Sequence, residues 1–207
     1  MKKIAAFITL VLLTVGLSAQ RFEGGIAGGL NLTQLDGDML SGYNKVGLNG
    51  GFWIKYPFTD KWSAGLDFLY MQKGAVRTID ENNIAATHAF DKFRVHYVEI
   101  PLYAGYTWKK FTGQAGLTGA YLFNAKTEDF TGIRDYKDKL KPFETGVLLG
   151  AAYQINEQLS IQLRWQYSIV SIAEGDSRTI FTDNGFSRRI VGLYNNLLSV
   201  SLKYAFK

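Results

Sequence analysis

The chain has 207 residues, a formal net charge of +5, 14% aromatic residues, 22 glycines, three prolines and no cysteine. Without cysteine there is no disulfide framework, no thiolate metal site and no lipidated N-terminal cysteine, and so mild a charge predicts no nucleic-acid partner. The length suits one domain with a sizeable core, and many aromatic residues and glycines with few prolines favour β-strands.

The first 20 residues have the pattern of a secretory signal peptide. Lys2 and Lys3 form a positive start, residues 4–17 are apolar, and small residues follow. The alternative, an anchoring transmembrane helix, needs about 20 apolar residues, which is more than this run contains. We predict a signal peptide over residues 1–20, cleaved after Ala19 or Gln20, and a barrel domain over residues 21–207. Loss of Lys2 and Lys3 would lower the net charge from +5 to +3.

Eight segments after the signal peptide alternate between apolar and polar residues with a period of two, which predicts strands. They cover residues 22–35, 44–58, 61–75, 93–109, 111–125, 142–156, 157–173 and 193–207. These segments are longer than most strands of soluble proteins, and they suit tilted strands of about 9–11 residues that cross a bilayer and extend beyond it.

The fourth segment shows the alternation most clearly. One face carries Val98, Ile100, Leu102, Ala104, Tyr106 and Trp108, and the other carries Tyr97, Glu99, Pro101, Tyr103, Gly105 and Thr107. In the seventh segment, one face carries Leu159, Ile161, Leu163, Trp165, Tyr167 and Ile169, and the other carries Ser160, Gln162, Arg164, Gln166 and Ser168. Each strand therefore has one apolar and one polar face.

The connections between the predicted strands alternate between short and long. Tight turns are predicted at Thr59-Asp60, Lys109-Lys110 and Asn156-Glu157, and long polar loops at residues 36–43, 76–92, 126–141 and 174–192. Short turns on one rim and long loops on the other are typical of outer-membrane barrels. The predicted fold is therefore an all-β, eight-stranded antiparallel up-and-down transmembrane barrel with both ends of the barrel domain on the short-turn, periplasmic side.

The position of charges and aromatic rings favours a membrane barrel over a soluble one. The polar faces carry eight ionisable residues, four acidic and four basic: Glu23, Lys55, Asp67, Lys73, Glu99, Glu144, Arg164 and Lys203. If the apolar faces pointed inward, their many large rings would overfill an eight-stranded barrel. The rings also fall near the short turns or toward the long loops, as the two aromatic belts of a membrane barrel do.

We expect the inward charges to pair and to plug the lumen, because burying an unpaired charge costs several kcal/mol. Their distance from the short-turn rim predicts the pairs Lys55–Asp67, Lys73–Glu99 and Glu23–Lys203. The alternative is a water-filled interior in which the charges are hydrated.

Four stretches resemble the PorT-like family of small outer-membrane β-barrels. They are the glycine-rich residues 23–31, residues 51–53 with 62–66, residues 97–102, and the closing residues 198–206. The resemblance implies a membrane barrel, and some members of that family are implicated in protein secretion. The penultimate Phe206 lies one residue away from the terminal Phe that the barrel insertion machinery recognises in many such barrels.

Candidate chemical sites are few, and we predict no catalytic residue, cofactor site or metal site. His88 falls in a long loop and His96 near the loop end of the fourth strand, without the neighbours that a hydrolase needs. Asp36-Gly37-Asp38 is interpreted as a turn, since the rest of a calcium loop is missing. Residues 24–29 are interpreted as strand glycines, and residues 51–53 share a lipocalin-like pattern in the wrong strand. The loops carry basic residues that could contact anionic lipopolysaccharide: Arg134, Lys137, Lys139, Lys141, Arg178, Arg188 and Arg189.

The leading hypothesis is an integral, monomeric outer-membrane barrel with a structural, interaction or envelope-assembly role through its loops or its periplasmic rim. Its expected partners are outer-membrane lipid, lipopolysaccharide and the barrel insertion machinery. Two alternatives remain: a narrow solute channel, and an exported soluble, lipocalin-like ligand-binding barrel or barrel enzyme.

Overall fold

A computed structural model describes residues 22–37, 42–76, 92–129, 132–174, 178–181, 187–190 and 192–206. The predicted signal peptide lies outside these residues. Eight strands form the barrel wall: β1 (Glu23–Asp36), β2 (Lys45–Pro57), β3 (Trp62–Val76), β4 (Lys92–Trp108), β5 (Phe111–Asp129), β7 (Phe143–Gln154), β8 (Leu159–Ser168) and β11 (Tyr194–Ala205).

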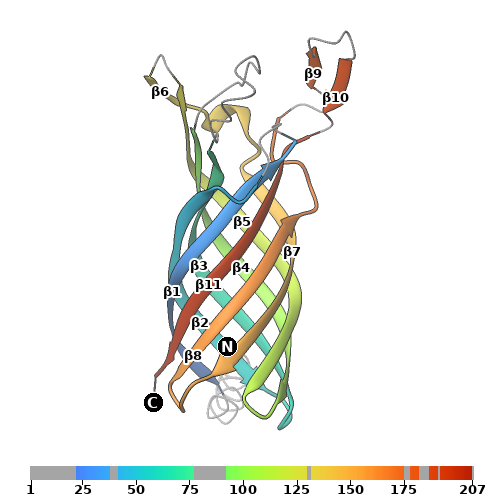
Figure 1. Cartoon of the computed structure of the whole chain (residues 1–207). Coiled ribbons are helices and arrows are strands. Elements are labelled where there is room, and N and C mark those ends of the chain that lie inside the picture. Colours follow the sequence, from blue (N-terminus) through green and yellow to red (C-terminus); the bar gives the residue numbers. More distant parts are fainter. Residues whose placement is uncertain are drawn as a thin grey trace, which may run out of the picture.

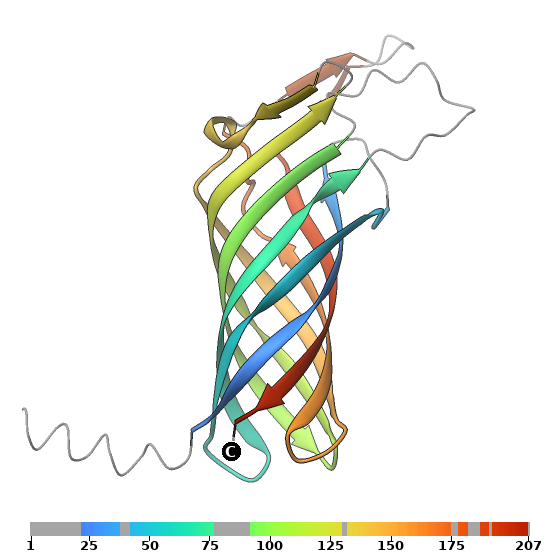
Figure 2. The ribbon, with the colours of Figure 1, turned by 90° about the vertical axis from the view of Figure 1, so that its left-hand side faces the viewer.

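The eight wall strands form a closed antiparallel barrel (Figure 1). Consecutive wall strands pair in order, β11 pairs with β1, and β4 pairs with β5, so that no wall strand keeps a free edge. The strands are strongly tilted and the barrel is elongated (Figure 2). The predicted all-β, eight-stranded antiparallel up-and-down barrel is therefore confirmed. Within the described residues, no helix is long and apolar enough to span a membrane.

The three tight turns lie together at one end, beside the start of β1 and the end of β11 (Figure 1). In the two-residue turn after β4, Lys109 adopts a positive φ of 57°. The first central residue of a type I′ or II′ hairpin turn requires such a conformation. In the turn after β7, Asn156 Oδ1 accepts hydrogen bonds from the backbone amides of Gln158 and Leu159, at 2.9 and 2.7 Å. Side-chain capping of this kind fixes the register of the hairpin that follows.

The long-loop end departs from the predicted strand limits in two places. β5 continues to Asp129, four residues beyond the prediction, because it pairs there with the short strand β6 (Gly132–Asp135). β8 ends at Ser168 instead of residue 173, because the chain then turns across the barrel mouth. The 3-10 helix η2 (Lys137–Lys139) follows β6, and β9 (Arg178–Phe181) and β10 (Ser187–Ile190) form a separate hairpin. Segments predicted as plain loops thus contain short regular elements.

The predicted faces of the wall strands are confirmed. On β4, the five inward residues from Tyr97 to Gly105 are buried, and the outward residues from Ile100 to Trp108 are exposed. On β8, the exposed residues include Ile161 and Leu163, and the buried inward residues are Gln162, Arg164, Gln166 and Ser168. The outside is apolar around the barrel, which is the arrangement expected of a wall that faces lipid.

Candidate functional site

The lumen at the long-loop end is filled by an apolar cluster rather than by water-exposed polar groups. Wall residues such as Phe93 and Leu35 pack there against Leu140 and Ile172, which come from the loops, and all four are buried. Backbone hydrogen bonds hold these loops in the mouth: the Lys141 amide donates to the Ile172 carbonyl, and the Ile172 amide donates to the Leu193 carbonyl, both at 2.8 Å. We call this cluster, with its loop residues, the apolar cap.

An ion cluster lies below the apolar cap. The Lys73 ammonium lies 2.6 Å from a Glu99 carboxylate oxygen and 2.9 Å from a Glu144 oxygen, and all three side chains are at most 3% exposed. Glu144 also accepts hydrogen bonds from the Ser168 hydroxyl, at 2.8 Å, and from the Asn195 amide, at 2.7 Å. This upper cluster joins β3, β4, β7, β8 and β11 and carries one excess negative charge.

A second ion cluster lies nearer the short turns. Asp67 receives Arg164 Nη1 at 2.7 Å, Lys203 Nζ at 3.3 Å and the Tyr103 hydroxyl at 3.1 Å. The Arg164 guanidinium lies 4.5 Å from the Tyr103 ring centroid, and Lys203 Nζ lies 4.7 Å from that of Trp53. This lower cluster carries one excess positive charge, which balances the upper cluster.

All eight inward charges that the sequence singled out are therefore paired, but not all with the predicted partners. Lys73–Glu99 is confirmed. The pairs Lys55–Asp67 and Glu23–Lys203 are wrong, because Lys55 Nζ lies 2.7 Å from Glu23, its neighbour in the β1–β2 register. Asp67 instead pairs across the lumen with residues of β8 and β11. The lumen is narrow enough for long side chains to reach strands that are not neighbours. A comparison of charge positions along adjacent strands does not reveal such pairs.

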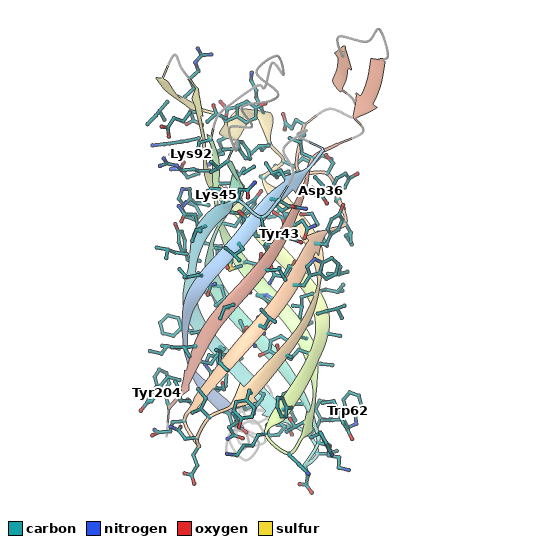
Figure 3. The ribbon with its side chains drawn as sticks, viewed as in Figure 1. Asp36, Tyr43, Lys45, Trp62, Lys92 and Tyr204 are labelled. Carbon is teal, nitrogen blue, oxygen red and sulfur yellow. The ribbon has the colours of Figure 1, made fainter. Side chains whose placement is uncertain are left out.

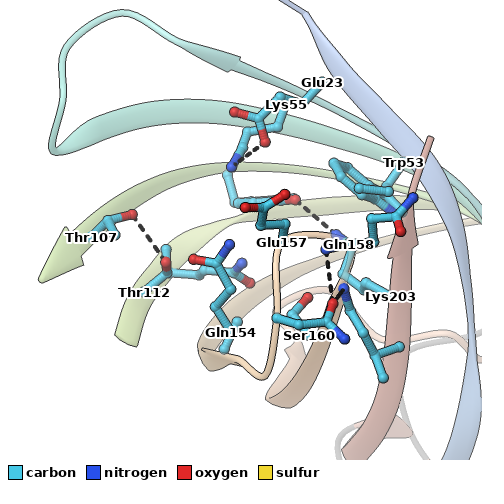
Figure 4. Close-up of a pocket in the computed structure, with 16 residues that line it drawn as sticks. Glu23, Trp53, Lys55, Thr107, Thr112, Gln154, Glu157, Gln158, Ser160 and Lys203 are labelled. Carbon is cyan, nitrogen blue, oxygen red and sulfur yellow. Dashed lines mark hydrogen bonds and ion pairs between the residues drawn. The ribbon is translucent and has the colours of Figure 1, made fainter. Parts of the chain in front are cut away.

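The short-turn end holds a cavity of about 130 Å³ below the lower cluster (Figure 4). Its lining combines the Glu23–Lys55 pair, Trp53, Lys203 and several hydroxyl and amide side chains. Gln114, at its roof, accepts hydrogen bonds from Arg164 Nε and Gln162 Nε2, at 3.1 and 2.9 Å. At about 30 Å³ for each water molecule in the liquid, this cavity has room for roughly four waters. The Lys55 and Glu23 side chains in its lining are 34% and 48% exposed, so the cavity is open to solvent at the short-turn rim.

The outward face carries aromatic rings near both ends, as predicted. Phe22 packs on Tyr56, Trp62 on Tyr106, and Phe111 on Tyr153 near the short turns, with centroids 4.9 to 5.0 Å apart. Toward the long loops, the rings of Tyr70, His96 and Phe123 lie about 6 Å from one another, and Tyr121 packs on Phe143, Trp165 on Tyr167 and Tyr167 on Tyr194. Figure 3 shows Trp62 and Tyr204 projecting from the wall near the short turns.

The remaining candidate residues occupy structural positions. His96 lies on the outward face with its Nδ1 2.7 Å from the Tyr70 hydroxyl oxygen. Asp36 ends β1 and accepts a hydrogen bond from Gln34 Nε2 at 2.9 Å, and Gly37 follows with a φ of 103°. The glycines of residues 24–29 lie in β1, and Trp53 of the lipocalin-like pattern lies inside the lumen. Among the described residues, no group of three or more His, Cys, Asp or Glu could hold a metal.

Several candidates fall outside the described part of the chain. His88 and Asp38 are among them, and the side chains of Arg178, Arg188 and Arg189 are not described. The loop residues Arg134, Lys137, Lys139 and Lys141 lie on β6, on η2 and just after it, at the long-loop end.

Comparison with known proteins identifies the family. Residues 18–174 match the model of the outer membrane protein beta-barrel domain. The chain belongs to this family. In such barrels the long loops are extracellular and the short turns periplasmic, and the two ends are named accordingly below. Family membership and the apolar outward face together exclude the soluble-carrier alternative.

Solved outer-membrane barrels resemble the chain at low identity. Ail, the attachment invasion locus protein of Yersinia pestis, is 13% identical, with a TM-score of 0.49 and coverage of 89% of this chain and 98% of Ail. Neisserial surface protein A is 9% identical, with a TM-score of 0.49 and coverage of 89% and 96%. AlkL is 14% identical, with a TM-score of 0.41 and coverage of 89% and 91%. No curated protein sequence matches the chain.

The apolar cap is the main feature of the lumen that the sequence analysis missed. A signal for it exists on β3 and β4, where Leu69, Met71, Phe93 and Val95 share the inward parity of Asp67 and Glu99. Apolar residues on the inward face indicate that the lumen becomes dry toward the extracellular end. The loop contribution of Leu140 and Ile172 has no comparable signal, because isolated apolar residues are common in loops.

Proposed function

We propose that the protein is a closed, non-conducting barrel of the outer membrane that acts by interaction or in envelope structure, through its extracellular end or its periplasmic rim. The single observation that carries the proposal is the filled lumen. A solute from the periplasmic cavity would meet the buried lower cluster, then the upper cluster, then the apolar cap. Opening this path means separating buried ion pairs, which costs several kcal/mol for each unpaired charge.

Planar-bilayer conductance tests this proposal against the narrow solute channel. Purified full-length mature protein is inserted at high salt beside a general porin as the positive control. A matched variant, Lys73→Ala with Arg164→Ala, removes one long side chain from each ion cluster. The expected result is no stable conductance step for the native protein. Porin-like steps from the native protein would overturn the proposal and favour the channel.

Two finer assignments belong to the same proposal. The resemblance to PorT-like barrels would place the protein in that branch of the family, and the N-terminal pattern would make residues 1–20 a signal peptide. Mass spectrometry of the protein purified from outer membranes tests the second assignment. The expected first residue is Gln20 or Arg21, whereas a retained Met1 would contradict it.

A further inference from the structure

A row of basic side chains lies on the outward face at the extracellular end of β4 and β5. Lys92 and Arg94 alternate with the inward Phe93 on β4, and Lys126 of β5 lies directly opposite Arg94 in the register. The Lys92 and Arg94 side chains are 37% and 42% exposed, and Lys126 is also exposed. We call Lys92, Arg94 and Lys126 the basic row.

The basic row lies directly above part of the upper aromatic belt. His96 is the outward residue next below Arg94 on β4, and its ring packs with those of Tyr70 and Phe123. Two residues of a strand span about 6.6 Å, so the basic row begins one such step above the last aromatic rings. Aromatic side chains of this kind mark the membrane–water interface. The basic row is therefore at the height of lipid headgroups rather than at a loop tip.

The charges of the basic row are only partly neutralised. Glu128 contacts Arg94 at 2.9 Å and Lys92 at 3.5 Å, and it is the one acidic group that the described residues place in an ion pair with the row. Lys45, which is buried, lies within electrostatic reach of both Arg94 and Lys92. Asp135 of β6 also lies opposite Lys126 in the register, so the three positive charges of the row have two carboxylates beside them and keep one excess positive charge, to which Lys45 adds from inside the wall.

On the wall of the extracellular end, the basic row and an acidic group lie on different sides of the barrel. Figure 3 shows Lys45 and Lys92 on one side of the upper barrel and Asp36 on the other. On that other side, Asp36 and the Tyr43 hydroxyl lie in a hydrogen-bonded group with Asn196, which adds no positive charge. Among these wall residues, the basic row therefore occupies one position around the barrel.

We propose that the basic row binds the phosphate groups of the phosphorylated glucosamine headgroup of outer-leaflet lipopolysaccharide, with the acyl chains of that lipid on the Tyr70–Phe123 surface. Arg94 offers paired N–H donors to a phosphate, and Lys92 and Lys126 add point charges on either side. The apolar wall below the basic row would contact the acyl chains of the lipid. A free phosphate has no acyl chains, so it would gain nothing from this surface. The inference rests on the proposed outer-membrane function, and it names one lipid partner and its position.

Lipid binding to the full-length mature protein in detergent micelles tests the proposal. The probes are diphosphoryl lipid A, the same lipid without phosphates, and free pyrophosphate as competitor, with bound lipid measured by native mass spectrometry. The variant is Arg94→Gln with Lys126→Gln. The matched control is Lys61→Gln with Lys110→Gln, which removes two exposed lysines at the periplasmic turns. A heat-dependent mobility shift on gels verifies that each protein is folded.

The native protein and the control are expected to bind diphosphoryl lipid A about tenfold or more tightly than the dephosphorylated lipid, and the variant is expected to lose this preference. Pyrophosphate should compete only weakly. Lys126→Gln alone, which leaves the Arg94–Glu128 pair intact, serves as a second variant with a smaller loss. Equal affinity of native protein and variant would overturn the proposal, as would full competition by pyrophosphate. Conductance is unaffected by either result, so the failure of this inference is distinguishable from failure of the closed-barrel proposal.

Discussion

Replacing Asp67 by Asn is expected to be among the most destabilising single substitutions in the lumen. Asp67 is the only carboxylate of the lower cluster, where it pairs with Arg164 and Lys203 and accepts the Tyr103 hydroxyl. Its side chain is 1% exposed. The substitution preserves shape but leaves two buried cations without a counter-charge, and the excess charge of the cluster rises from +1 to +2.

The expected cost is about 3–5 kcal/mol, the range seen when one partner of a buried ion pair is removed. The matched control is Glu23→Gln at the periplasmic mouth, where the Lys55 and Glu23 side chains are 34% and 48% exposed. An exposed pair of this kind contributes roughly 0–1 kcal/mol. The double variant Asp67→Asn with Arg164→Gln should cost less than the sum of its two single variants, because the pair is coupled.

Equilibrium unfolding by urea in lipid vesicles, followed by tryptophan fluorescence and by the gel mobility shift, measures these free energies. Folding and unfolding titrations must coincide for the values to be used. If Asp67→Asn lost no more stability than Glu23→Gln, the lower cluster would have to be well hydrated. The water-filled interpretation of the lumen would then replace the plugged one.

Three further outcomes test other parts of the structure. Brominated lipids should quench the tryptophan fluorescence of a variant that keeps only Trp62, because this side chain is 47% exposed on the outward face. They should leave the fluorescence of a variant that keeps only Trp53, which is 7% exposed, almost unchanged. Strong quenching of Trp53 would mean that the inside and outside of the barrel are assigned the wrong way round. Gly65→Ala would place a methyl group in the Tyr103 ring and should cost about 1–3 kcal/mol in the same urea titration, whereas Gly28→Ala, which meets nothing within 4 Å, should stay within about 0.5 kcal/mol of the native protein; equal effects would argue against the close packing at Gly65. Leu140→Ala should weaken the apolar cap locally by about 2–5 kcal/mol. It should accelerate trypsin cleavage after Lys137 and Lys139 with the gel shift retained, and unchanged cleavage would show that the loop is held by other contacts.

The sequence by itself determined the wall of this barrel. A period of two assigns each strand residue to one face, and three short turns fix which strands are neighbours. On β4, that pattern is enough to place Glu99 and Tyr103 inside and Leu102 and Trp108 outside. It also selects eight inward charges that sum to zero, and it separates aromatic residues into two belts. These properties are local, so a single sequence reveals them.

Only the tertiary structure decided what fills the lumen. Asp67 meets Arg164 and Lys203 because closure of the barrel brings β3 opposite β8 and β11. The distance across the lumen depends on strand number, tilt and stagger together, which no stretch of sequence encodes. The apolar cap has the same origin, since Leu140 and Ile172 become buried only when two loops hydrogen-bond across the mouth. Local alternation therefore fixed the inside and the outside, whereas closure of the sheet fixed the contacts that seal the barrel.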